Sequence, residues 1–353
     1  MLAPLLDDGA GQIERAAIAV STFSAQSFPD AIRNVLRALP RGMRSEVITD
    51  AVVAHDVRGW LDEAGLGFAR LRIAPADWNY SLWMQDPLIV RVDGSASVSE
   101  AFDRYRDRDI ALFLRKRAGW RAGEAPVHVD GGNVLVHGAL TLVSVDVEAD
   151  DDALTAFDPM RRVVRVGTAA RCLQQTTRET DRPAPGWTET LNYLSTEGTR
   201  QPIFHLDHMI APAGVDGDRP RFLVGCPRLG AEVIEHPLQD HSQPGAFDEI
   251  AKLLEASGAA VLRNPLPQGW VDRPERKFRR WFHLPVNNVL IHGDRVLLPS
   301  FANEYWPELE ALDAANADLW QGLGFDTIPI PGMMALAEAM GGPRCMVKVT
   351  ARG

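Results

Sequence analysis

Alternating apolar and polar residues predict β-hairpins at several places along the chain. Two segments are nearly the same: GNVLVHGALTLVS at 132–144 and NNVLIHGDRVLLPS at 287–300 share the pattern N-V-L-[VI]-H-G. In each, the alternation predicts two short strands with a turn at His-Gly. Looser versions lie near residue 84, near residue 205 and at the C-terminal end, in RCMVKVTARG. The chain therefore repeats one hairpin unit.

Between the hairpins, apolar residues recur at helical spacing. Helices are predicted over 28–39, 97–120, 245–258 and 306–324. The second is expected to begin at Ser97, because Glu100 three residues later completes a capping box. Hairpins and helices that alternate at intervals of roughly 60 to 80 residues predict an α/β fold of five pseudo-symmetric units in a single domain, 1–353.

Residues 149–201 fit none of these units. They are rich in Thr, Arg, Asp and Pro, as in QQTTRETDRPAPGWTE. Such a composition is typical of connecting segments, which run over the surface of a domain. We expect a loop insertion there, over one face of the molecule.

Composition narrows the class of protein. With 46% hydrophobic and 24% charged residues, the chain is typical of a soluble globular protein. Its net charge of -10, with basic residues scattered among carboxylates, argues against a nucleic-acid partner and suits a cationic ligand. Three cysteines, at 172, 226 and 345, are too few for a disulfide framework and favour a reducing compartment. The N-terminus does not resemble a secretory signal and no apolar stretch could cross a bilayer, so a cytoplasmic protein without a membrane partner is expected.

The segment IFHLDHMIAP is expected to be a buried strand. Alternation along a strand would place His205 and Asp207 on one face and His208 on the other. A buried imidazole beside a carboxylate is either a hydrogen-bonded core pair or a catalytic pair. His-x-Asp-His could also supply metal ligands. No second histidine cluster accompanies it, so a site without metal is expected.

Other candidate residues stand at predicted turns and strand starts. Asp86 follows Trp83 and is either a turn residue or a partner for a guanidinium, which pairs with carboxylates and stacks on aromatic rings. Asp130 precedes two glycines, as in a tight turn. Cys345 follows GGPR and is either a small buried apolar residue or a nucleophile, whose thiolate Arg344 would favour. One Cys, one His and several Asp in different units are the arrangement expected around one central site.

The order of five short motifs resembles the guanidino-group-modifying enzymes of the pentein fold. These motifs are WMQD (83–86), DGGN (130–133), HLD (205–207), NNVLI with LLP (287–299) and GGPRCM (341–346). WMQD is similar to a motif of protein-arginine deiminases, whereas DGGN and GGPRCM are closer to agmatine and arginine deiminases. The resemblance covers residues of about 15–353 and implies a five-bladed α/β propeller.

The resemblance also implies roles for individual residues. Cys345 would be the nucleophile and His205 the general acid and base. Asp86 and Asp207 would hold the guanidinium, and Asp130, at a position where deiminases carry Glu and amidinotransferases Asp, would orient the histidine. Further substrate-binding residues would be Trp83, Asn133 and Arg344. Arg344 stands where many relatives have His.

The implied activity is a deiminase that converts an arginine-type guanidinium to a ureido product and ammonia through a covalent thiouronium on Cys345. Free arginine, agmatine, methylarginines and peptidyl arginine all remain as substrates, and a homodimer is compatible with the pattern. No cofactor is implied. An amidinotransferase, in which an amine intercepts the same intermediate, is the first alternative. A non-catalytic binder of cationic guanidino ligands is the second.

Overall fold

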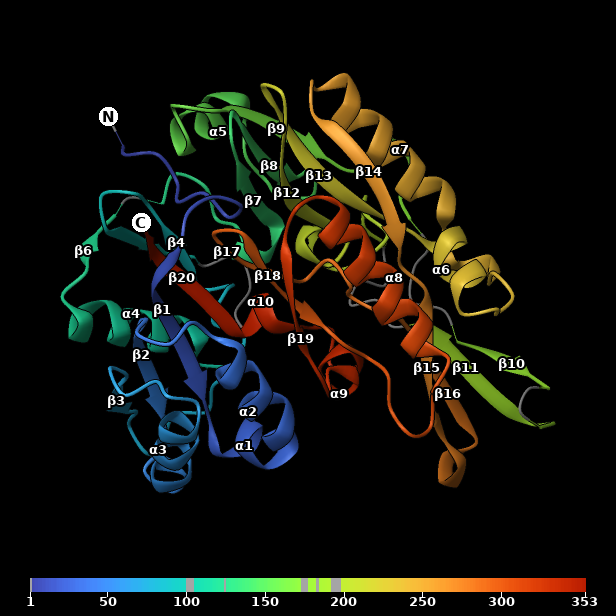
Figure 1. Ribbon diagram of the computed structural model, residues 1–353, viewed down its shortest axis with the longest axis horizontal. Coiled ribbons are helices and arrows are strands. Elements are labelled where there is room, and N and C mark those ends of the chain that lie inside the picture. Colours follow the sequence, from blue (N-terminus) through green and yellow to red (C-terminus); the bar gives the residue numbers. More distant parts are fainter. Residues whose placement is uncertain (1, 100–104, 124, 173–176, 182–183, 192–197) are drawn as a thin grey trace.

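The computed structural model describes residues 2–99, 105–123, 125–172, 177–181, 184–191 and 198–353. Within these ranges the chain forms a mixed α/β fold with six sheets (Figure 1). No helix of the described residues has the length and apolar character that crossing a bilayer requires.

Five of the six sheets in the described ranges share one plan. In each, two strands pair antiparallel, as a hairpin in four of the sheets, and a third strand joins the second one in parallel. Four of these sheets are contiguous in sequence: β4 (Leu88–Val90), β5 (Ser95–Val98) and β6 (Arg121–Ala122); β7 (Val134–His137), β8 (Leu140–Ser144) and β9 (Arg162–Val166); β12 (Ile210–Asp216), β13 (Arg219–Cys226) and β14 (Ala260–Pro265); β17 (Leu290–His292), β18 (Arg295–Pro299) and β19 (Asp326–Ile330). The hairpins expected from the repeated motif are therefore confirmed.

The fifth sheet joins the two ends of the chain. Its order is β20 (Val347–Arg352), β1 (Ile13–Val20), β2 (Arg44–Thr49) and β3 (Arg70–Ile73). The first and last strands run antiparallel side by side (Figure 1), and β2 and β3 follow in parallel. The C-terminal run is thus the first strand of a unit whose other strands lie at the N-terminus.

Helices form the crossover connections that parallel strands require. Helices α2 (Pro29–Ala38), α7 (Pro244–Ala256) and α8 (Leu309–Gly322) lie where the apolar spacing predicts them. The remaining helices are α1 (Thr22–Ser27), α3 (Ala54–Glu63), α4 (Asp107–Ala118), α5 (Asp151–Phe157), α6 (Pro227–Val233), α9 (Met334–Glu338) and α10 (Pro343–Met346).

The helix expected from Ser97 starts later. Ser97 lies in strand β5, where it pairs with Ile89, and α4 begins at Asp107. Acidic residues in the first turn of α4 and basic residues in its last turn match the helix dipole, and Gly119 ends it in the left-handed conformation. Glu100, the partner in the expected capping box, lies outside the described residues.

Residues 149–201 are not a loop throughout, contrary to expectation. The acidic run there opens helix α5, because the Asp150 side chain accepts a hydrogen bond from the amide of Ala153. Strand β9 follows. The Thr- and Arg-rich part forms strands β10 (Thr177–Thr180) and β11 (Trp187–Leu191). These join β16 (Phe278–His283) and β15 (Gln268–Arg273) in the sixth sheet, which extends away from the other five at the lower right of Figure 1.

The N-terminal segment is anchored by a buried ion pair. Asp7 Oδ1 lies 3.2 Å from His137 Nδ1, and His137 Nε2 lies 2.7 Å from the carbonyl oxygen of Gly214. A carbonyl oxygen only accepts hydrogen bonds, so Nε2 of His137 must carry a proton. Nδ1 faces a carboxylate oxygen and must carry a proton as well. The ring is therefore an imidazolium. Burial alone would lower the pKa of His137, but the hydrogen bond and charge of Asp7 outweigh it and raise the pKa. The pKa of Asp7 is lowered: its burial acts upward, and His137 with two backbone amides acts downward more strongly.

We expect Asp7→Asn to destabilise the protein in a pH-dependent way. The stabilisation that His137 contributes is complete below its unfolded pKa of about 6.5, and it is lost as the pH rises through the raised pKa of the folded state. The stabilisation that Asp7 contributes is lost in acid, below about pH 4. The loss in free energy of unfolding should therefore be about 1–3 kcal/mol near pH 5.5 and smaller at about pH 9. Urea unfolding at the two pH values measures it. Glu63→Gln, which removes an exposed partner of Arg33, is the control and should show no such difference; an equal effect of Asp7→Asn at both values would contradict the imidazolium.

Candidate active site

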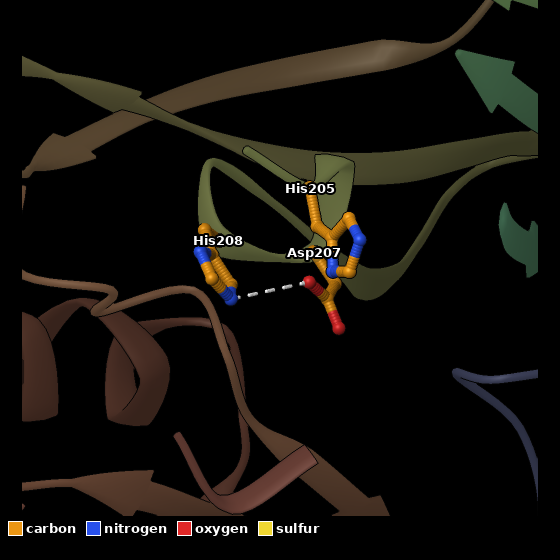
Figure 2. A group of neighbouring side chains, drawn as sticks. All are labelled: His205, Asp207 and His208. Carbon is orange, nitrogen blue, oxygen red and sulfur yellow. Dashed lines mark ion pairs between the residues drawn. The ribbon is translucent and has the colours of Figure 1, made fainter. Parts of the chain in front are cut away.

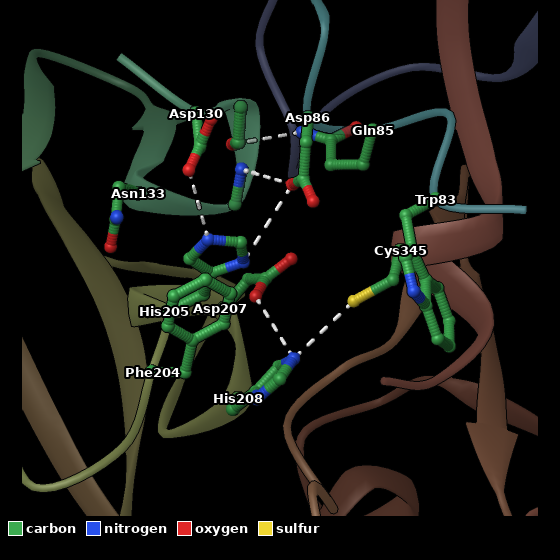
Figure 3. A network of polar contacts seen from close by, with 12 residues as sticks. Trp83, Gln85, Asp86, Asp130, Asn133, Phe204, His205, Asp207, His208 and Cys345 are labelled. Atoms are coloured by element: carbon green, nitrogen blue, oxygen red, sulfur yellow. Dashed lines mark hydrogen bonds and ion pairs between the residues drawn. The ribbon is translucent and has the colours of Figure 1, made fainter. Parts of the chain in front are cut away.

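Four candidate residues, together with Asn288, occupy equivalent places in the five units. Asp86 stands just before β4, Asp130 before β7, Asp207 before β12, Asn288 before β17 and Cys345 before β20. Because each first strand begins at the same region of the molecule, the residues that precede the strands converge. Figure 3 shows Asp86, Asp130, His205, Asp207 and Cys345 around one centre. The structure thus brings together all five residues that the sequence assigns to catalysis.

His205 lies between two carboxylates. Its Nδ1 is 3.6 Å from Asp86 Oδ1 and its Nε2 is 3.6 Å from Asp130 Oδ2, so both contacts are ion pairs rather than hydrogen bonds. The ring of Phe204 stacks on the imidazole with 3.9 Å between centroids. Burial alone would lower the pKa of His205, but Asp86, Asp130 and Asp207 together raise it. A protonated His205 is the state that a general acid requires.

The expected strand at His205 is wrong. Leu206–His208 form a turn of 3₁₀ helix, and β12 begins only at Ile210. In a 3₁₀ turn, side chains three residues apart lie on the same side. His208 therefore turns toward the site with His205 instead of facing away from it (Figure 2).

Cys345 is held by two residues that sequence reasoning missed. Its Sγ lies 3.3 Å from His208 Nε2 and 3.1 Å from Asn288 Nδ2, which donates to it. Asn288 Oδ1 also accepts from the amides of Arg344 and Cys345. The repeated motif could have identified Asn288, because it occupies the position of Asn133 in the other copy. The position of His208 depends on the 3₁₀ turn, which no pattern in the sequence separates from a strand.

The thiol of Cys345 is a poor nucleophile in this resting arrangement. Burial raises its pKa well above the usual value, and the charges of Asp207 and Asp86 raise it further. Arg344 lowers the pKa less than these effects raise it, so the expected thiolate beside Arg344 is not favoured in the unliganded site.

Arg344 is buried and paired within the protein. Its Nη1 donates to Asp207 Oδ2 at 2.6 Å, and its Nη2 donates to Asp8 Oδ1 at 3.0 Å and to the carbonyl of Val134 at 3.1 Å. A guanidinium with these partners supports the site rather than extending toward a ligand. Its contact leaves the other oxygen of Asp207, Oδ1, buried and without a hydrogen-bond partner among the described residues. Burial raises the pKa of Asp207 despite Arg344 and His205.

Trp83 and Asn133, the other expected substrate-binding residues, lie at opposite sides of the site in Figure 3. Trp83 is buried, at 9% exposed, and is not at an open edge. Its ring packs on Gly341, where a Cβ would come within 2.2 Å of the ring. Asn133 accepts a hydrogen bond from Gln201 and lies on the far side of His205 from Cys345 in Figure 3.

The glycines of DGGN and GGPRC permit close packing. A Cβ on Gly131 would meet the carbonyl oxygen of Gln85 at 2.0 Å, and one on Gly342 would meet Asn288 Oδ1 at 2.7 Å. One on Gly132 would meet His205 Nδ1 at 2.3 Å. They make room for the protein's own side chains, not directly for a planar ligand.

His205, Asp207 and His208 have ligand atoms within 4.8 Å of one another, which is close enough for a metal ion (Figure 2). Two observations argue against one. The Arg344 guanidinium already neutralises Asp207 at 2.6 Å and would repel a dication, and the Nε2 of His208 is engaged with Cys345. These side chains suit a planar organic cation better.

We expect Gly132→Ala to reduce the free energy of unfolding by about 1–3 kcal/mol, because the added methyl group overpacks the contact between His205 and Asp86. Gly59→Ala in α3 is the matched control. A Cβ there meets nothing within 4 Å, so this variant should be more stable than wild type by about 0.5–1 kcal/mol. Urea unfolding of both variants measures the effects. A Gly132→Ala protein as stable as wild type would contradict the close approach.

Comparisons by sequence with family models and with curated proteins give no match. Comparison of structures gives neighbours over nearly the whole chain. A cysteine-to-serine variant of C. jejuni agmatine deiminase with substrate bound has a TM-score of 0.68 at 11% identity and covers 100% of this chain and 97% of its own. The agmatine deiminase of Enterococcus faecalis gives 0.65 at 12%, covering 99% and 96%, and an amidinotransferase from Microseira wollei gives 0.50 at 13%, covering 99% and 97%. The chain therefore has the fold of the guanidino-modifying enzymes, the pentein fold.

Proposed function

We propose that this protein is a guanidino deiminase, which hydrolyses a C–N bond of an arginine-type guanidinium to give a ureido product and ammonia. The observation that carries the proposal is a buried carboxylate oxygen, Asp207 Oδ1, beside a cysteine thiol and a doubly ion-paired histidine. Within the part of the chain that the structure describes, this oxygen has no hydrogen-bond partner. An unpaired buried carboxylate oxygen is costly. A planar cation with several N–H donors would satisfy it.

Charge supports a cationic substrate. The charges of Asp86 and Asp207 act on the Cys345 thiol, and those of Asp86, Asp130 and Asp207 act on His205. A cation bound beside these carboxylates would offset their charge. Burial lowers the pKa of Lys348 to about 8, so the charge of this neighbouring cation weakens above neutral pH.

The proposed reaction uses these contacts. Asp86 and Asp207 hold the guanidinium nitrogens and orient its carbon toward Cys345. The thiolate adds to that carbon, and His205 protonates the departing nitrogen. Ammonia then departs, and a cationic thiouronium remains on Cys345. His205, now neutral, takes a proton from water, whose oxygen adds to the same carbon. This adduct then collapses: its C–S bond breaks, the thiolate leaves, and the rest becomes the ureido product. The proton of the added hydroxyl passes to ammonia. Asp130 keeps His205 in place throughout.

The five hairpin units would form the blades of a five-bladed propeller in one domain, 1–353. Their common strand order and the pairing of β1 with β20 support this arrangement. A ring of blades would explain why five segments far apart in sequence deliver their residues to one centre. The agmatine deiminases among the structural neighbours make agmatine the first substrate to test.

Cys345→Ser should abolish the activity. Wild-type protein is incubated with agmatine, arginine, methylated arginines and an arginyl peptide, and ammonia and ureido product are measured. We expect product from at least one substrate, and a loss of at least about 10³-fold in Cys345→Ser, because no thiouronium can form. Cys226→Ser, also a buried free cysteine, is the matched control and should retain activity. Ammonia release at the wild-type rate from Cys345→Ser would overturn the nucleophile assignment.

The same assay separates the other functions. When glycine or lysine is supplied with arginine, ornithine in place of citrulline would identify an amidinotransferase; the amidinotransferase among the structural neighbours makes this the second candidate. Ligand binding without turnover of any guanidine would identify a non-catalytic binder.

Asp86→Asn should impair both binding and acid catalysis. Loss of one charged partner of the guanidinium is expected to lower kcat/KM by at least about tenfold. Asp86 also raises the pKa of His205, so its removal lowers that pKa, and the basic limb of the pH profile of kcat should move to lower pH. Steady-state kinetics across pH measures both effects. An unchanged basic limb would show that His205 is not the acid.

A further inference from the structure

His208 contacts the nucleophile but has no part in the reaction described above. Its Nε2 lies 3.3 Å from Cys345 Sγ and 3.7 Å from Asp207 Oδ1, and its side chain is buried. Figure 3 shows the ring reaching both groups from below the site. The histidine is therefore placed between the thiol and the carboxylate oxygen that lacks a hydrogen-bond partner.

The proposed reaction needs a thiolate, and the buried thiol must first lose its proton. Among the described residues, the only titratable group within hydrogen-bonding distance of Sγ is His208. The second polar contact of Sγ, Asn288 Nδ2, can donate a hydrogen bond but cannot accept the proton. His205 is engaged elsewhere, with Nδ1 facing Asp86 and Nε2 facing Asp130.

We infer that His208 is a further catalytic residue, which takes the Cys345 proton on Nε2 when the guanidinium binds and holds it during turnover. The S–H bond breaks and an N–H bond forms, so a thiol and a neutral imidazole become a thiolate and an imidazolium. Nδ1 carries the other ring proton. Asn288 then donates to the thiolate, and Asp207 Oδ1 lies close enough to stabilise the imidazolium. No other reactant is needed.

The charged groups around the pair explain why the transfer follows binding. Burial does most to raise the pKa of the thiol, and the charges of Asp207 and Asp86 raise it further; a guanidinium between these two carboxylates would cancel the second effect. The other titratable groups facing the pair are His205 on the same 3₁₀ turn, with 5.9 Å between ring centroids, His283 of β16 and Arg344 of α10. Burial lowers the pKa of His283 to about 4, so it stays neutral near pH 7 and does not compete.

Two histidines would thus divide two proton transfers. His205 protonates the leaving nitrogen and takes a proton from water, whereas His208 takes the proton of the thiol. The proton on His208 remains there when collapse of the adduct regenerates the thiolate, and it returns to sulfur when the site empties. The free enzyme would therefore protect its nucleophile as a thiol between turnovers.

The test measures how the rate of Cys345 alkylation depends on pH. The inference rests on the proposed function, but alkylation of Cys345 can be measured without any turnover of a guanidine. Wild type and His208→Gln are treated with 2-chloroacetamidine, a cationic alkylating agent, and modification of Cys345 is followed by mass spectrometry. We expect the rate constant near pH 7 to fall at least about tenfold in His208→Gln and its pH profile to move at least about one unit higher. The two proteins should converge at high pH, where hydroxide removes the proton.

His283→Gln is the matched control, because His283 is also buried and neighbours His208 but makes no hydrogen bond to sulfur; its profile should match wild type. Coincident profiles of wild type and His208→Gln would overturn the inference, and so would an equal loss at every pH, which would indicate only a structural role.

If His208→Gln does not fold, the wild-type protein labelled with ¹⁵N-histidine replaces it: millimolar guanidinium should produce a new imidazolium signal, and its absence would also overturn the inference. If no guanidine is turned over while the profile shifts, the proposed function fails and the role of His208 stands.

Discussion

The ion pair of Arg344 with Asp207 is the contact on which the site depends. It joins the turn before β12 to the turn before β20, and the same guanidinium reaches Asp8 in the N-terminal segment. Removing one partner of a buried pair leaves the other charge without compensation, which is strongly destabilising. Arg344 satisfies one oxygen of Asp207, and the other accepts no hydrogen bond from the residues that the structure describes. A structural cation therefore fixes in place the carboxylate that a ligand cation would need.

The hairpins and the candidate residues could be predicted from the sequence because both depend on short-range patterns. The turn at His-Gly needs only neighbouring residues, and the residues just before each first strand stand out as polar positions beside apolar runs. The 3₁₀ turn at Leu206–His208 could not be predicted. Three residues are too few to separate a period of two from a period of three, and the error reversed the direction of His208.

Contacts between distant parts of the chain explain the other differences. Arg344 is expected from the sequence to bind substrate because it stands beside two glycines and a proline, but its partners are the carboxylates at residues 8 and 207. The segment 149–201 has a loop-like composition, but β11 is stabilised by pairing with β16, far along the sequence. Local propensity is weak evidence where such pairing decides the structure. The glycines before Cys345 likewise reflect Trp83 and Asn288, which no local pattern reveals.

Burial gives the proposed chemistry its order of events. Burial raises the pKa of the Cys345 thiol, the charges of Asp207 and Asp86 raise it further, and the residue is only 2% exposed. An electrophile without a positive charge would meet a thiol, not a thiolate. A guanidinium would cancel the same charges that suppress the thiolate, so the substrate itself would create the nucleophile that attacks it. Selectivity for a cation would thus arise in two steps, binding and activation, from one pair of aspartates.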